Sequence, residues 1–276
     1  MTALPMRGRV LRARTHAEPA LEYFAFCPAS AAPSAPLLVA VHGYSRNAAE
    51  QVERWAPLCD ATGVVLVAPH FDAKRFRTYQ VLGNGADRAL DALVAELRQS
   101  FGMLLGNIAL TGFSGGGQFV HRYAMAQPKR VSSAAVVAPG WFTFPGREHE
   151  YPLGTRRARR HVGVRMRAEA FLRVPMLVAV GEHDDASDAE NLRHSEQLDA
   201  QQGASRLERA TRWVQAMHET AAQANCAPRV RLTVIPNAAH SFADCMDNGL
   251  GELVFAHAGI TTPAARAARK RLAARA

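Results

Sequence analysis

A serine flanked by glycines carries the strongest chemical signal in this sequence. Residues 110–118 read Leu-Thr-Gly-Phe-Ser-Gly-Gly-Gly-Gln, which places Ser114 in a Gly-x-Ser-x-Gly pattern. An apolar run precedes the pattern and a helical pattern follows it, as at a sharp strand-to-helix turn. Such a turn leaves no room for side chains, which accounts for Gly112 and Gly116. The pattern predicts a nucleophilic serine, with the backbone amide of Gly115 available to an oxyanion.

A nucleophilic serine needs a general base, because a free hydroxyl is a weak nucleophile at neutral pH. The chain offers 11 histidines. If the three residues follow the chain order Ser, Asp, His, the base comes after the last strand, and His240 lies on the loop after the apolar run 230–235. His121 and His218 lie within helical patterns and His16 on an early strand, where surface or packing roles are expected. We therefore assign His240 as the base.

The acid that orients this base should follow the preceding strand. Residues 181–188, Gly-Glu-His-Asp-Asp-Ala-Ser-Asp, hold three aspartates directly after the apolar run 176–180. Asp184 fits best, because it lies just beyond the end of that run. Sequence spacing cannot fix which carboxylate reaches the imidazole, so Asp188 and Asp185 remain alternatives.

A second oxyanion donor is expected on the loop after the apolar run 37–41. We assign the backbone amide of Tyr44 to this role, with the tyrosine ring as a possible wall of the substrate pocket. The adjacent His42 is predicted to be a packed loop histidine and not a catalyst. Trp141 and Phe142 are the other candidates for substrate contact.

The elements that would position these residues alternate along the chain. Two short strands, 8–15 and 21–27, form an antiparallel start. Short apolar runs typical of strands buried on both faces follow at 37–41, 64–68, 108–111, 134–138, 176–180 and 230–235. Helical patterns lie at 48–62, 87–101, 116–126 and 207–224. This alternation predicts a single α/β domain over residues 1–276, with a mostly parallel sheet covered by helices on both faces.

Two segments stand outside this alternation. The interval 141–171 is the longest between predicted strands and is a natural place for a small cap over the strand ends. The tail 263–276 is rich in alanine and arginine and is expected to be loose, as chain termini commonly are.

Composition limits the class of protein. With 276 residues, 48% of them hydrophobic, the chain can bury one large core. No apolar run approaches the roughly 18 residues of a membrane span, and the N-terminus lacks the apolar run and cleavage site of a secretory signal. We therefore expect a soluble cytoplasmic protein.

The net charge of +9 would ordinarily suggest a nucleic-acid partner. Only three of the 33 basic residues are lysines, and the arginines are spread along the chain without an aromatic-interleaved basic motif. No nucleic-acid partner is therefore expected. Four widely spaced cysteines without a Cys-x-x-Cys pair indicate reduced thiols and no zinc site, a Cys226–Cys245 disulfide being the alternative.

At these motifs the sequence resembles the α/β-hydrolase superfamily and, within it, the polyhydroxybutyrate depolymerase-like esterases, over essentially the whole chain. Four less generic stretches support the narrower match: 42–47, 115–122, 139–145 and 202–206. The resemblance implies an α/β-hydrolase fold and ester hydrolysis through an acyl-enzyme on Ser114, Asp184 and His240. It implies no cofactor and no metal.

Secreted depolymerases of this kind carry a signal and often a substrate-binding module, and neither is present in this sequence. A small soluble ester is therefore the expected substrate. A peptidase or thioesterase on the same triad, or a binding protein that keeps the fold without the chemistry, are the alternatives. The sequence leaves the oligomeric state open.

Residues 155–167 hold six arginines and no acid. The arginines fall within the expected cap: Arg156, Arg157, Arg159, Arg160, Arg165 and Arg167. One interpretation is a solvated face of a cap helix. The other is an electrostatic funnel for carboxylate-bearing esters.

Overall fold

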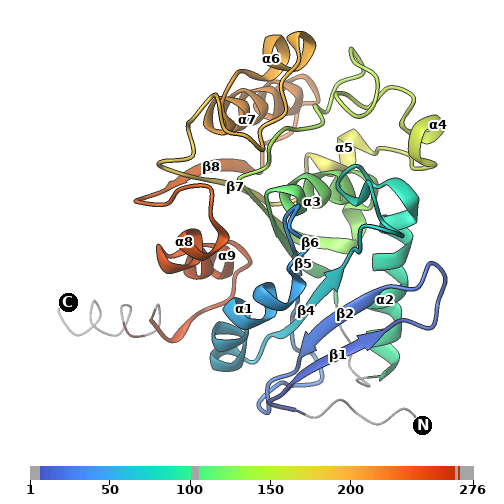
Figure 1. The fold of residues 1–276 in the computed structure, drawn as a ribbon, viewed down its shortest axis with the longest axis vertical. Coiled ribbons are helices and arrows are strands. Elements are labelled where there is room, and N and C mark those ends of the chain that lie inside the picture. The colour runs from blue at the N-terminus through green and yellow to red at the C-terminus, as the bar shows by residue number, and fades with distance from the viewer. Residues whose placement is uncertain (1–6, 101–105, 265–266, 268–276) are drawn as a thin grey trace.

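A computed structural model of the chain describes residues 7–100, 106–264 and 267 (Figure 1). Its strands form one eight-stranded sheet in the order β1-β2-β4-β3-β5-β6-β7-β8. The strand bounds are β1 Val10–Arg14, β2 Glu22–Phe26, β3 Leu37–Val41, β4 Val65–His70, β5 Ile108–Phe113, β6 Val131–Val137, β7 Met176–Gly181 and β8 Val230–Ile235. β1 and β2 pair antiparallel, β2 also pairs antiparallel with β4, and the other neighbours are parallel.

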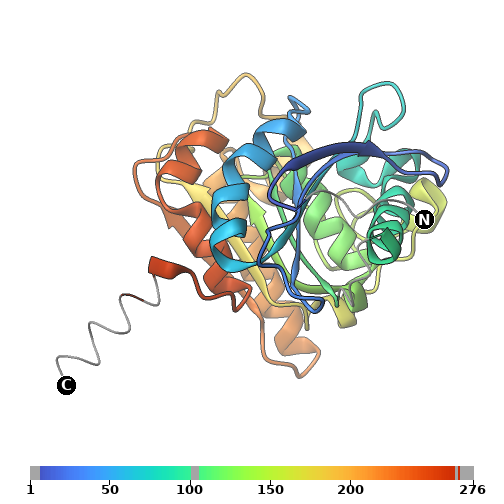
Figure 2. The same cartoon turned by 90° about the horizontal axis from the view of Figure 1, so that it is seen from below.

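Helices cover both faces of the sheet. The longer helices are α1 Ala48–Thr62, α2 Ala86–Ser100, α3 Gly115–Ala126, α7 Arg206–Gln223 and α9 Leu250–His257. Short helices complete the set: α4 Ala158–Val162, α5 Ala168–Phe171, α6 Glu196–Gln202 and α8 Phe242–Asp247, with 3-10 turns at Tyr79–Val81, Gly83–Gly85 and Pro128–Arg130. Figure 2 shows α1 and α9 on one side of the sheet and α2 and α3 on the other.

Alternate residues of each central strand face opposite sides of the sheet and pack into two separate hydrophobic cores. In β3, Leu37, Val39 and Val41 face the core shared with α2, α3 and α7. Leu38 and Ala40 face the opposite core, where Trp55 of α1 stacks on Phe255 of α9 with ring centroids 5.9 Å apart. Because both faces are covered, the central strands β3 and β7 carry no polar side chain, as the sequence indicated.

The predicted α/β fold with a mostly parallel sheet is confirmed, and β3, α1 and β8 have the predicted bounds. β6 begins earlier than predicted, because Ser132 and Ser133 interrupt the apolar run. His16, predicted on a strand, lies beyond the end of β1, where its amide donates to Glu96 at 3.0 Å. The predicted loose tail at 263–276 falls largely outside the described residues, as does Phe101 at the predicted end of α2.

The interval predicted as a cap contains mostly turns. Only α4 and α5 are helical between residues 141 and 171, and a short parallel bridge joins Glu150 to Arg156. Within the described ranges, no helix combines the length and apolar character that crossing a bilayer would require.

Candidate active site

Ser114 occupies a strained turn between β5 and α3. Its φ of 53° and ψ of −113° lie outside the regions that non-glycine residues ordinarily adopt. The turn depends on its glycines: a Cβ on Gly116 would lie 2.1 Å from the carbonyl oxygen of Val41, and one on Gly112 would lie 2.5 Å from the backbone of Gly116. Close packing of α3 against the strand ends therefore holds the serine in this conformation.

The loops after β7 and β8 are tied together at the same edge of the sheet. A Cβ on Gly181 would lie 2.3 Å from the carbonyl oxygen of Ala238, so only glycine lets the two loops approach. The His183 amide donates to that same oxygen at 2.9 Å. This contact brings Asp184, on the first loop, beside His240, on the second.

Ser114, His240 and Asp184 form a continuous hydrogen-bonded series. His240 Nε2 lies 3.2 Å from Ser114 Oγ, and His240 Nδ1 lies 2.7 Å from Asp184 Oδ2. An ionised carboxylate only accepts hydrogen bonds, so Nδ1 carries the proton and Nε2 is free to accept the serine proton. Asp184 is 3% exposed and the His240 side chain 16% exposed. The arrangement can transfer a proton from serine to imidazole while a buried anion stabilises the imidazolium.

The two alternative acids lie elsewhere. Asp185 and Asp188 are both exposed, and among the described residues neither has a hydrogen bond or ion pair to His240. The geometry therefore favours Asp184 among the three aspartates.

The loop after β3 brings a second backbone amide to the serine. The Tyr44 amide nitrogen would lie 3.3 Å from a Cβ on Gly115, so the two proposed oxyanion donors are neighbours. The buried Tyr79 hydroxyl fixes this loop by donating to the carbonyl oxygens of His42 and Gly43, at 3.0 and 2.9 Å.

His42 is a packed loop residue, as the sequence indicated. Its Nδ1 donates to the Gly43 carbonyl at 2.8 Å and its Nε2 accepts from the Phe71 amide at 3.0 Å. Burial lowers the pKa of His42 to about 3, although the bond to Gly43 opposes the shift. The ring is therefore neutral at working pH and serves as a fixed link between two loops.

The cavity beside Ser114 is small, with a volume of about 240 Å³. Its walls come from four segments of the chain: Gly43, Tyr44, Ser45, Asn47, Glu50, Gln51, Phe113, Ser114, Asn191, His240 and Phe242. The Tyr44 ring is 72% exposed and stands at this cavity. No residue of the interval 141–171 contributes to these walls.

The other two predicted substrate contacts lie elsewhere. Phe142 is fully buried and stacks on Trp213 with ring centroids 4.8 Å apart, so it serves the core. Trp141 lines a different pocket, described below. The prediction for Phe142 is therefore wrong: the residue points inward, and its backbone amide donates to Gln202 Oε1 at 2.8 Å.

Sequence analysis missed Arg206, which binds the other oxygen of the proposed acid. Its Nη1 donates to Asp184 Oδ1 at 2.9 Å, and both side chains are 2–3% exposed. Its Nη2 donates to Asn191, which lines the serine cavity. Arg206 opens α7, where a cation opposes the helix dipole, and that unfavourable placement was a signal that a carboxylate lies nearby.

Arg206→Met is expected to lower kcat by roughly tenfold to a hundredfold, since Asp184 would lose the partner that orients it. Steady-state kinetics measures this effect, with melting temperature recorded for each variant so that kcat is normalised to folded protein. Arg206→Lys, which keeps the charge, should retain kcat within a few-fold of the parent. An Arg206→Met protein with the parent kcat would contradict this role.

All four cysteines are free thiols, including Cys226 and Cys245. Among the described residues, no group of three or more His, Cys, Asp or Glu side chains is arranged to hold a metal ion.

Comparison with known proteins supports the fold and, more coarsely, the chemistry. No protein-family model matches the chain. A curated relative, the bifunctional acetylxylan esterase/xylanase XynS20E of Neocallimastix patriciarum, is 25% identical over 130 residues. The match spans 46% of this chain and only 19% of that longer protein.

Solved structures match over nearly the whole chain. The poly(3-hydroxybutyrate) depolymerase LpqC of Bordetella parapertussis has a TM-score of 0.78 at 27% identity, covering 95% of each chain. Poly(aspartic acid) hydrolase-1 of Sphingomonas sp. KT-1 has a TM-score of 0.81 at 23% identity, covering 91% of this chain and 100% of that one. An S-formylglutathione hydrolase of Agrobacterium tumefaciens has a TM-score of 0.60 at 15% identity, covering 91% and 94%. The predicted resemblance to this superfamily is confirmed.

Proposed function

We propose that this chain, an α/β-hydrolase similar to known esterases and depolymerases, hydrolyses carboxylic esters through an acyl-enzyme on Ser114. The observation that carries the proposal is the unbroken hydrogen-bonded series from Ser114 through His240 to Asp184, at 3.2 and 2.7 Å. A strained serine on a tight turn, next to two backbone amides, is what acyl transfer requires.

The reaction would proceed in two halves. His240 Nε2 takes the Ser114 proton as Oγ attacks the ester carbonyl, and the amides of Gly115 and Tyr44 stabilise the oxyanion. The imidazolium then gives its proton to the departing alcohol, leaving an acyl-serine. Water, deprotonated by the same imidazole, attacks the acyl-serine, and the imidazolium returns its proton to Ser114 Oγ as the acid departs. Asp184 keeps the imidazole in the required tautomer throughout and takes no proton itself.

Ester is the substrate class that the relatives favour. Two of them are named for ester cleavage, the acetylxylan esterase and the poly(3-hydroxybutyrate) depolymerase. The similarity to the S-formylglutathione hydrolase leaves thioester hydrolysis as an alternative activity for this chain. The similarity to the poly(aspartic acid) hydrolase leaves amide hydrolysis as another. Because the same triad serves all of these reactions, substrate tests must separate them.

A panel of p-nitrophenyl esters should show highest kcat/KM for short acyl chains. The serine cavity of about 240 Å³ is below the size of most ligand pockets, so acyl groups beyond its capacity should lose roughly tenfold in kcat/KM. Matched amide and thioester substrates complete the panel, and a fluorophosphonate probe reports the reactive serine independently. Faster turnover of the amide or thioester would replace the ester assignment. Failure of the probe to label Ser114 would favour a non-catalytic binding protein.

A further inference from the structure

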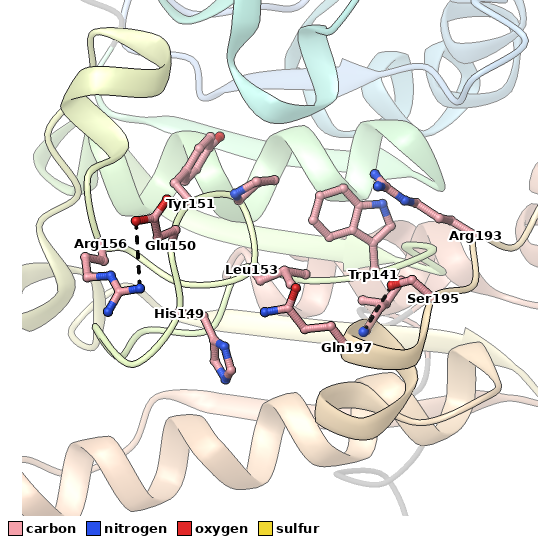
Figure 3. A pocket seen from close by; sticks show the side chains of 11 residues that line it. Trp141, His149, Glu150, Tyr151, Leu153, Arg156, Arg193, Ser195 and Gln197 are labelled. Carbon is pink, nitrogen blue, oxygen red and sulfur yellow. Dashed lines mark hydrogen bonds and ion pairs between the residues drawn. The ribbon is translucent and has the colours of Figure 1, made fainter.

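Seven arginines line two concave regions outside the serine cavity. The first has a volume of about 460 Å³ and is shown in Figure 3, with Trp141 and Arg193 at one end and Glu150 and Arg156 at the other. The second, of about 680 Å³, is built around the start of α4 and α5. Together they carry Arg147, Arg156, Arg157, Arg159, Arg165, Arg167 and Arg193, which we call the arginine surface. Only two acids line it, Glu150 and Glu169.

Most of this positive charge is uncompensated within the protein. Arg157 pairs with Glu150 at 2.6 Å, and Arg156 approaches the same carboxylate at 3.8 Å. In the part of the chain that the structure describes, the other five arginines have no ion pair with an acid. An array of exposed guanidinium groups around a hollow repels itself unless an anionic ligand occupies it.

The linings of the two regions and of the serine cavity come from connected stretches of the chain. Arg156 lines the first region and Arg157, its neighbour in sequence, lines the second. Asn191 lines the serine cavity, and Arg193, two residues later, lines the first region. The backbone amide of Gln118 donates to the Ser114 carbonyl oxygen at 3.1 Å. The side-chain nitrogen of Gln118 lies 3.4 Å from where a Cβ on Gly140 would be, and Gly140 directly precedes Trp141. A chain molecule that reacts at Ser114 could therefore continue along the arginine surface.

The chemistry of the surface fits oxyanion ligands. Each guanidinium presents a planar fork of donors that matches a carboxylate or a phosphate in bidentate geometry. Because the proposed reaction is hydrolysis of carboxylic esters, the carboxylate is the oxyanion that its substrates and products contain. Single-stranded nucleic acid would need aromatic faces on which bases stack. Trp141, the one tryptophan of these linings, is flanked by guanidinium groups: Arg122 lies 4.2 Å and Arg193 5.7 Å from its ring centroid.

We propose that the arginine surface binds the carboxylate groups of a polyanionic chain whose ester reacts at Ser114. This inference rests on the proposed function, which it deepens by naming the substrate class as an oligomeric or polymeric polycarboxylate ester. The arginines hold the part of the chain that does not react, and the small serine cavity receives only the reacting group.

Binding of fluorescent poly(glutamate) to the Ser114→Ala protein tests this site without turnover. Arg159→Gln with Arg165→Gln, added to that protein, should raise Kd about tenfold, because each lost exposed pair costs somewhat under 1 kcal/mol. The matched control is Arg9→Gln with Arg14→Gln, which removes the same charge near β1 and should change Kd less than about twofold. Binding should also weaken as salt rises, since exposed charges are screened over about 10 Å at 0.1 M.

Three outcomes would overturn the proposal. Equal weakening by both double variants would mean that net charge alone attracts the polymer. Tighter binding of single-stranded DNA of equal charge would identify a nucleic-acid site. No saturable binding at low salt would mean that the arginines form a solvated face. Hydrolysis of a neutral short ester by the unaltered protein tests the proposed function separately, so either idea can fail alone.

Discussion

Ser114→Ala is expected to remove nearly all turnover, lowering kcat by on the order of 10⁴- to 10⁶-fold while the fold remains intact. The serine hydroxyl makes one described hydrogen bond, to His240, and caps no backbone amide of α3. Alanine can occupy the same turn, because the strain there is imposed by the packing of Gly112 and Gly116 and not by the serine side chain. Loss of activity therefore reports loss of the nucleophile.

Steady-state hydrolysis of p-nitrophenyl acetate measures this effect, with circular dichroism and melting temperature to verify the fold. Ser132→Ala is the matched control, since Ser132 is an exposed serine on β6. The control should keep parent activity. More than a few per cent of parent turnover in the Ser114→Ala protein would show that another residue is the nucleophile.

Asp184→Asn is expected to lower kcat by roughly 10³- to 10⁴-fold. The asparagine side chain can present its NH₂ group to His240 Nδ1 in place of an acceptor oxygen. The imidazole would then adopt the tautomer with its proton on Nε2, which cannot accept the serine proton. The substitution also leaves buried Arg206 without its anionic partner and should reduce stability. Kinetics must therefore be normalised to folded protein.

Asp185→Asn and Asp188→Asn are the controls for this prediction, because both carboxylates are exposed and close in sequence to Asp184. Each should retain kcat within a few-fold of the parent. If Asp188→Asn lost kcat while Asp184→Asn kept it, the assignment of the acid would be wrong, and so would the role proposed for Arg206.

The sequence determined the eight strands, four of the helices and the chain order of the candidate triad residues. Strand β3 is buried on both faces and apolar at every position, so the run at 37–41 could be located without a structure. The edge strand β8 was located from its β-branched residues at 230–235, although Arg231 on it is exposed. A serine between glycines fits only a tight turn, and an aspartate and a histidine after later strands must meet it at the carboxyl edge of a parallel sheet. These inferences depend on local periodicity and chain order, which a sequence contains.

The tertiary structure decided which side chains face one another. Asp184 lies beside His240 because Gly181 allows its loop to approach Ala238, a contact between segments far apart in sequence. Contacts of the same kind join Arg206 to Asp184 and place Phe142 in the core against Trp213. The fold also adds Arg193 to the arginines of residues 147–167 that line the two concave regions. The direction of a side chain beyond the end of a strand is set by the packing of its loop, and that packing depends on residues that the local sequence does not specify.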